Sequence, residues 1–276
     1  MKKLLFTLLA FISISTYGQN DLETKTQPIV DEGKRLYKSE MASWYGTDLF
    51  LENHPDKTNI GGYFSYTQDE VSKCIFFSKG DKPKVIGTIT FDNTYNTKTA
   101  GVDLAERDFS TIETDLFSIR KLALETINSD TLFKRYDNTQ YNIIPLINKD
   151  EKKVYVLTGS QQNGMVFLGN DYVLTFDLHN KLVQKKKIHK NLIPIKFEGK
   201  EQAGGMAMHS HLPETGEFIT ATDICTLMLY EKLTKWRFHY VVSKNYVSIW
   251  NCLTDELTVM TMEAFKKISK EEENKK

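Results

Sequence analysis

Residues 204–230 have the sequence GGMAMHSHLPETGEFITATDICTLMLY, whose pattern changes from that of a strand to that of a helix. The apolar run 206–208 predicts a strand, and Pro213 and Gly216 mark the turn that follows it. Thr220 is a residue type that commonly caps helices. After it, apolar residues recur at helical spacing and predict a helix to about residue 233. These apolar residues are Ile224, Leu227, Met228 and Tyr230.

Two histidines, His209 and His211, lie at the end of the predicted strand. Side chains at positions i and i+2 of a strand point to the same side, so both imidazoles are expected on one side of the strand end. Asp223 lies in the first turn of the predicted helix, and a helix that returns beside the strand would bring its carboxylate to the histidines. Two imidazoles and one carboxylate leave a fourth position for water, which is the ligand pattern of a catalytic zinc site. The sequence therefore predicts zinc as the cofactor, with His209, His211 and Asp223 as ligands.

A structural interpretation of the same residues stays open. A His-x-His pair is a short pattern, and Thr220 with Asp223 has the spacing of a capping box, in which side chains satisfy backbone N–H groups at a helix start. Each residue alone is explained by such ordinary roles. The strand pattern before these residues and the helix pattern after them favour a metal site.

The order of these features resembles the JAMM motif of the MPN-domain metalloproteases, in which His-x-His-Pro is followed by a serine and, three residues later, an aspartate. The similarity extends over residues 140–262, because two strand patterns, 238–243 and 246–250, follow the predicted helix as a strand pair does in that family. The resemblance implies an MPN-like domain that binds zinc and hydrolyses a peptide or isopeptide bond in a peptide or protein substrate. It also implies that Thr220, in the place of the family's serine, helps to stabilise the developing oxyanion.

The chain departs from the family motif at three points. Leu212 separates His211 from the proline, so the interval from His211 to Asp223 is twelve residues instead of eleven. Threonine replaces serine at position 220. The family's general-base glutamate, on a strand fifty to sixty residues upstream, has no clear counterpart, and Glu151 is the best-placed candidate for that catalytic role. The missing base favours an alternative function, that of a non-catalytic extracellular binding protein that retains the fold.

The rest of the chain predicts an α+β fold, with an N-terminal helix and antiparallel sheet followed by the MPN-like domain of mixed sheet and flanking helices. Helical spacing covers 26–41 and 111–126, and Ser110 with Glu113 forms a capping-box pattern before the second helix. Aromatic and β-branched runs at 62–67, 72–77 and 84–91 predict an antiparallel meander. We expect a signal peptide at 1–18, an N-terminal region of unassigned role at 20–140, a JAMM/MPN-like domain at 141–265 and a charged tail at 266–276.

The N-terminus has the pattern of a signal peptide. Lys2 and Lys3 precede the apolar run 4–14, and small or polar residues follow up to Gly18. Such a run is too short to cross a bilayer core, which needs about 20 apolar residues. The residue directly after Gly18 is Gln19 and not a cysteine, so we expect no lipid anchor and no membrane anchor after cleavage. The expected location is outside the cytoplasm, either periplasmic or secreted.

The charge balance argues against a nucleic-acid partner, because 36 Lys and Arg residues face 36 Asp and Glu residues in a chain of 276. Three cysteines at wide spacing form neither a disulfide framework nor a CxxC metal knuckle, and they are expected in the core. The remaining histidines are expected to be ordinary surface or structural residues. These residues are Cys74, Cys225 and Cys252, and His54, His179, His189 and His239.

Aromatic residues of the N-terminal half leave a further alternative open. They alternate along the predicted strands, so they are expected to fill a core, although they would also suit a ligand surface. The residues are Tyr63, Phe64, Tyr66, Phe76 and Phe77.

Overall fold

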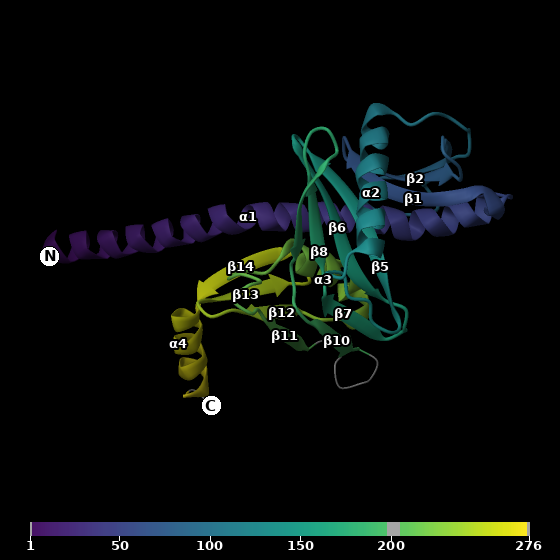
Figure 1. Ribbon diagram of the computed structural model, residues 1–276. Helices are drawn as coiled ribbons and strands as arrows, with labels where there is room; N and C mark the ends of the chain where they lie inside the picture. Colours follow the sequence, from purple (N-terminus) through teal and green to yellow (C-terminus); the bar gives the residue numbers. More distant parts are fainter. Residues whose placement is uncertain (1, 198–204, 275–276) are drawn as a thin grey trace.

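The computed structural model describes residues 2–197 and 205–274, and it confirms the α+β class (Figure 1). Met1, Gly204 and the last two residues of the predicted tail lie outside the described residues. Within them the helices are α1 (Lys2–Asn53), α2 (Thr111–Ser129), α3 (Ala221–Thr234) and α4 (Met262–Glu273), with a short 3-10 helix at Lys57–Asn59.

The predicted meander forms an antiparallel sheet in the order β1-β2-β3-β4. Its strands are β1 (Ile60–Gln68), β2 (Val71–Ser78), β3 (Val85–Phe91) and β4 (Gly101–Asp103). The short strand β4 was not expected from the sequence. Most of the aromatic residues of β1 and β2 are buried in the core, whereas Tyr63 is 37% exposed.

Within the described residues, two further four-stranded sheets and one two-stranded sheet follow. The first has the antiparallel order β5-β6-β8-β9, and β7 pairs with β10 beside it. The second has the order β11-β12-β13-β14, in which only the β11–β12 pair is parallel. The strands are β5 (Thr139–Asn148), β6 (Glu151–Ser160), β7 (Met165–Gly169), β8 (Tyr172–Phe176), β9 (Leu182–Lys187), β10 (Leu192–Lys196), β11 (Met206–Ser210), β12 (Phe238–Val242), β13 (Tyr246–Asn251) and β14 (Glu256–Thr261).

Helix α1 connects the two halves of the fold, because it packs against α3 and against the β1–β3 sheet. Gly33 permits the close approach of α1 to α3, since a Cβ atom there would lie 2.7 Å from the side chain of Ile224. A core cluster with Val30 of α1 and Leu227 of α3 surrounds this contact. The start of α3 is therefore fixed by helix packing.

The extents of the terminal helices differ from expectation. Helix α1 runs well beyond the predicted 26–41, and residues 2–18 continue it away from the sheets, on the left of Figure 1. The predicted charged tail is largely helical as part of α4, where the ring centroid of Phe265 lies 6.2 Å from that of Tyr240.

Cleavage of the signal peptide after Gly18 stays a prediction. Among the described residues, no helix has the length and apolar content to cross a membrane.

The hydrophobic core does not stop at the predicted domain boundary. Helix α2, from the N-terminal half, packs through Ile119 and Ala123 on Val154 and Tyr172 of the β5–β9 sheet. The division of the chain at residue 140 stays a prediction about domains, although the two sides share this core.

Helix α2 begins with the predicted capping box. The Ser110 N–H donates to Glu113 Oε2 at 2.8 Å, and the Glu113 N–H donates to Ser110 Oγ at 3.4 Å. Arg107 donates to both carboxylate oxygens of Glu113, at 2.6 and 2.8 Å, and Tyr66 donates to it at 3.2 Å. The Glu113 side chain is 2% exposed, so this network is a buried anchor between α2 and the first sheet.

Glu113→Gln is expected to lower the free energy of unfolding by about 2 kcal/mol at neutral pH, because a buried charged acceptor is lost. Burial alone would raise the pKa of Glu113, but the hydrogen bonds from Arg107 and Ser110 outweigh burial and hold this pKa at about 2. The ionised carboxylate therefore stabilises the folded state at pH values above 4.5, the ordinary pKa of a glutamate. This contribution is lost as the pH falls from 4.5 towards 2.

Denaturant unfolding at several pH values tests this prediction. The stability difference between Glu113→Gln and the wild type should shrink below pH 4.5. Glu106→Gln is the matched control, because Glu106 forms only an exposed ion pair with Lys84 at 3.4 Å and its loss should change little. Equal stability of the Glu113→Gln variant and the wild type at neutral pH would contradict the assigned role.

Candidate metal centre

Four buried side chains from three segments converge at one point of the second half. His189 lies between β9 and β10, His209 on β11, His211 just after β11, and Asp223 in the first turn of α3. One potential ligand atom from each residue lies within 4.8 Å of all the others. The four side chains are between 1% and 8% exposed, so the cluster is enclosed by protein.

Several distances in the cluster are close to the spacing of ligands around one metal ion. The Nε2 atom of His211 lies 3.1 Å from that of His209, 3.3 Å from that of His189 and 3.2 Å from Asp223 Oδ2. Asp223 also lies 3.5 Å from His189 Nε2 through Oδ2 and 3.6 Å from His209 Nε2 through Oδ1. Four ligands at zinc distances of about 2.0–2.1 Å would be separated by about 3.3–3.4 Å. The cluster therefore has a size that suits a zinc ion.

The strand end positions the two motif histidines. Strand β11 runs parallel to β12, with His209 opposite Val241, and the His211 N–H continues the pairing by donating to the Val242 carbonyl at 2.9 Å. This confirms the expected strand, and both imidazoles reach the same cluster as their i, i+2 spacing predicts.

Asp223 is held by the N-terminal cap of α3. The Thr220 N–H and hydroxyl donate to Asp223 Oδ2 at 3.0 and 2.8 Å, and the Asp223 N–H donates to Thr220 Oγ1 at 3.1 Å. The capping box and the cluster are therefore not alternatives. One carboxylate forms the cap and faces the three imidazoles.

Two of the imidazoles have a hydrogen-bond partner on the side away from the cluster. Asp171 Oδ2 lies 3.1 Å from His189 Nδ1, and His239 Nε2 lies 2.8 Å from His209 Nδ1. Such contacts orient the rings of metal-binding histidines and direct their other nitrogen to the ion. His189 and His239 are thus not the isolated histidines that the sequence indicated.

The electrostatics of the cluster favour a cation. Burial lowers the pKa of His209 to about 4 and that of His239 to about 3, so both are neutral at pH 7, the form in which imidazole binds metals. Burial would also lower the pKa of His189, but the charges of Asp223 and Asp171 outweigh it and raise this pKa to about 10. The two buried carboxylates thus draw positive charge into the cluster, and a divalent cation would balance them.

One further atom points to a cation. Asp223 Oδ1 is buried and has no hydrogen-bond donor, although it faces His209 Nε2 at 3.6 Å. A buried carboxylate oxygen without a partner is costly, and coordination of a metal ion would satisfy it. His211 Nδ1 also lacks a partner, so this ring is positioned by its backbone and its neighbours alone.

The structure does not bring Glu151 to the cluster. Its side chain is 65% exposed and pairs with Lys153 at 3.1 Å at the start of β6. Towards the other end of β6, the Thr158 N–H donates at 3.3 Å to Oδ1 of Asp171, the carboxylate that contacts His189. Seven residues of strand separate the two positions, about 23 Å at the usual rise. Thr220 does reach the cluster, but as a donor to Asp223.

Access to the cluster is narrow. A cavity of about 40 Å³ adjoins His189 and His209, lined also by Ser210, Leu212 and Thr215. This volume is large enough for water but too small for a large peptide side chain. The site is therefore largely closed in the described conformation.

Comparison with protein-family models, curated proteins and solved structures finds no match to this chain.

Thr220→Ala is expected to lower the free energy of unfolding by about 1 kcal/mol, because the helix loses its capping hydroxyl. Thr220→Ser keeps the hydroxyl and should retain most of the stability. Denaturant unfolding in a chelator measures the cap without any contribution from a bound ion. Equal destabilisation by alanine and serine would show that the hydroxyl does not hold Asp223.

Proposed function

We propose that this protein binds one zinc ion through His189, His209, His211 and Asp223, and that the ion stabilises the second half of an exported, non-catalytic binding protein. The observation that carries the proposal is the convergence of four ligand atoms within 4.8 Å of one another in an enclosed cluster, with His211 Nε2 lying 3.1–3.3 Å from the other three. The export signal and the MPN-like character of this half are parts of the proposal that rest on the sequence.

The donor set favours zinc over other common ions. Three imidazole nitrogens and one carboxylate oxygen suit four-coordinate Zn²⁺, whereas Mg²⁺ and Ca²⁺ prefer six or more oxygen ligands. Copper and nickel also accept imidazole but favour tetragonal geometry. The two carboxylates, Asp223 in the cluster and Asp171 behind His189, balance the charge of a divalent ion.

The number of ligands favours a structural role for the ion. Structural zinc sites have four protein ligands, whereas catalytic sites usually have three and an open position. Among the described residues, two carboxylates contact the cluster. Asp223 is one of the proposed ligands, and Asp171 is hydrogen-bonded to His189. Neither is free to accept a proton from water, and this supports the non-catalytic alternative.

The ion would join segments that are far apart in the chain. His189 belongs to the connection before β10, His209 to the edge strand β11, and Asp223 to α3. Because the unfolded chain does not present these ligands together, the free energy of metal binding adds to the free energy of folding.

A second candidate function is zinc-dependent hydrolysis of a peptide or isopeptide bond. His209, His211 and Asp223 meet as the JAMM resemblance implies, and the small cavity beside His189 and His209 admits water. Zinc bound there would act as a Lewis acid towards a carbonyl group. In this case His189 would have to leave the ligand set to open a position, and Thr220 would orient Asp223 through its hydrogen bond.

The purified chain is expected to bind one equivalent of zinc, and a strong chelator should lower its melting temperature. His189→Ala and His209→Ala should each lose stoichiometric zinc and the stabilisation by zinc, because the tetrahedral ligand set is broken. Elemental analysis of dialysed protein and thermal melting with and without zinc measure both effects.

His179→Ala is the matched control, because this exposed histidine lies outside the cluster. It should retain both the zinc content and the zinc-dependent melting temperature. Retention of one zinc ion by the His189→Ala variant would show that three ligands suffice and would exclude the four-ligand site. Absence of stoichiometric metal from the wild type after zinc loading would contradict the proposal as a whole.

Zinc-loaded protein is expected not to hydrolyse peptides or isopeptide-linked substrates, since the site lacks an open position and a free base. Mass spectrometry of a mixed peptide and isopeptide library after incubation provides the measurement. Cleavage by the wild type that disappears in His209→Ala and persists in His179→Ala would establish the second candidate function instead.

A further inference from the structure

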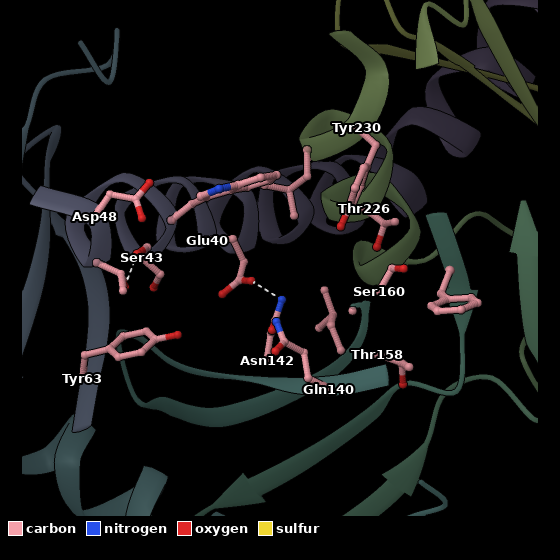
Figure 2. Close-up of a pocket in the computed structure, with 16 residues that line it drawn as sticks. Glu40, Ser43, Asp48, Tyr63, Gln140, Asn142, Thr158, Ser160, Thr226 and Tyr230 are labelled. Carbon is pink, nitrogen blue, oxygen red and sulfur yellow. Dashed lines mark hydrogen bonds between the residues drawn. The ribbon is translucent and has the colours of Figure 1, made fainter. Parts of the chain in front are cut away.

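A second site is formed by a cavity of about 340 Å³ between α1, β1, β5, β6 and α3 (Figure 2). Its volume falls within the roughly 300–1,000 Å³ of small-molecule sites. Figure 2 shows Glu40, Tyr63 and Asn142 directed into the same space from three different elements. The cavity is distinct from the small one beside the metal centre.

The wall of the cavity that α1 forms alternates between acidic and aromatic side chains. Glu40, Trp44 and Asp48 are spaced four residues apart, so they lie along one side of the helix. The stripe therefore presents a carboxylate, an indole ring and a second carboxylate over about 12 Å of helix rise. Asp48 and Trp44 are exposed and Glu40 is partly buried, so the stripe runs from the surface into the cavity.

The two carboxylates have no positively charged partner. Glu40 accepts a hydrogen bond from Asn142 Nδ2 at 2.7 Å, and neither Glu40 nor Asp48 forms an ion pair within the described part of the chain. None of the residues that line the cavity is a lysine, arginine or histidine. Enclosure raises the pKa of Glu40 to about 7 despite the hydrogen bond from Asn142.

Aromatic rings lie between and opposite these carboxylates. Trp44 and Tyr230 have ring centroids 6.3 Å apart, and Tyr63 of β1 also lines the cavity. Aromatic faces attract ammonium groups and also pack against methylene chains. Arg120 lies over the Tyr63 ring at 6.0 Å but does not line the cavity.

We propose that this cavity binds a linear aliphatic polyamine. One ammonium group pairs with Glu40 inside the cavity, a second pairs with Asp48 at its exposed end, and the methylene chain between them packs on Trp44. Neutral side chains complete the site and accept hydrogen bonds from the remaining N–H groups. These are Gln140 and Thr226. The proposal does not depend on the bound metal.

Isothermal titration calorimetry of the purified chain with spermidine tests the proposal. One equivalent should bind saturably, and Glu40→Gln should weaken binding at least tenfold, since it keeps the shape of the side chain and removes its charge. Trp44→Leu should also weaken binding severalfold. Glu52→Gln is the matched control, because this exposed residue of α1 lies outside the cavity and its loss changes the net charge equally.

Three results would overturn the proposal. The first is the absence of saturable spermidine binding. The second is equal weakening of binding by Glu40→Gln and Glu52→Gln, which would indicate diffuse charge attraction. The third is equally tight binding of octanediol, a neutral chain of similar length. Glu40→Gln should melt at or above the wild-type temperature, because it removes an enclosed charge. If Glu40→Gln does not fold, the Trp44→Leu variant is used instead, because Trp44 is 46% exposed and its replacement should leave the fold intact. Unchanged spermidine binding by Trp44→Leu would also overturn the proposal.

Discussion

The carboxylate of Asp223 is shared between the cap of a helix and a cluster of three imidazoles. Its Oδ2 atom accepts hydrogen bonds from Thr220 and lies 3.2 Å from His211 Nε2. The cap fixes the side chain relative to α3, and the close contact of α3 with α1 at Gly33 fixes the helix relative to the rest of the fold. The position of the anionic ligand is thus set by packing, and the histidines of β11 and of the β9–β10 connection converge on it.

Local rules were sufficient to predict three of the four members of this cluster. The i, i+2 spacing of His209 and His211 and the place of Asp223 at a helix start follow from the geometry of single elements. His189 could not be predicted in this way, because no periodicity in its own segment shows that the β9–β10 connection returns to the end of β11. Asp171, on the turn before β8, was missed for the same reason.

Glu151 illustrates the opposite error of sequence reasoning. Its place before an apolar strand made it the best candidate for a general base, but the direction of β6 brings the far end of that strand, at Thr158, to the cluster. The fold class, the meander and the capping box at Ser110 followed from periodicity and turn chemistry. The additional strands β4, β10 and β14 are short or carry mixed patterns, and they depend on partners that only the tertiary structure supplies.

The candidate metal centre and the proposed polyamine cavity are built on some of the same elements. The Thr158 N–H contacts Asp171, and Thr158 also lines the cavity, while Thr226 lines it one turn after Asp223 on α3. An ion bound by Asp223 would therefore also help to hold one wall of the cavity. Zinc K-edge X-ray absorption of the zinc-loaded chain measures the ligands of the ion directly. We expect four ligands at about 2.0–2.1 Å with the outer scattering of three imidazole rings. A spectrum of six oxygen ligands, or one with fewer than three imidazoles, would contradict this expectation.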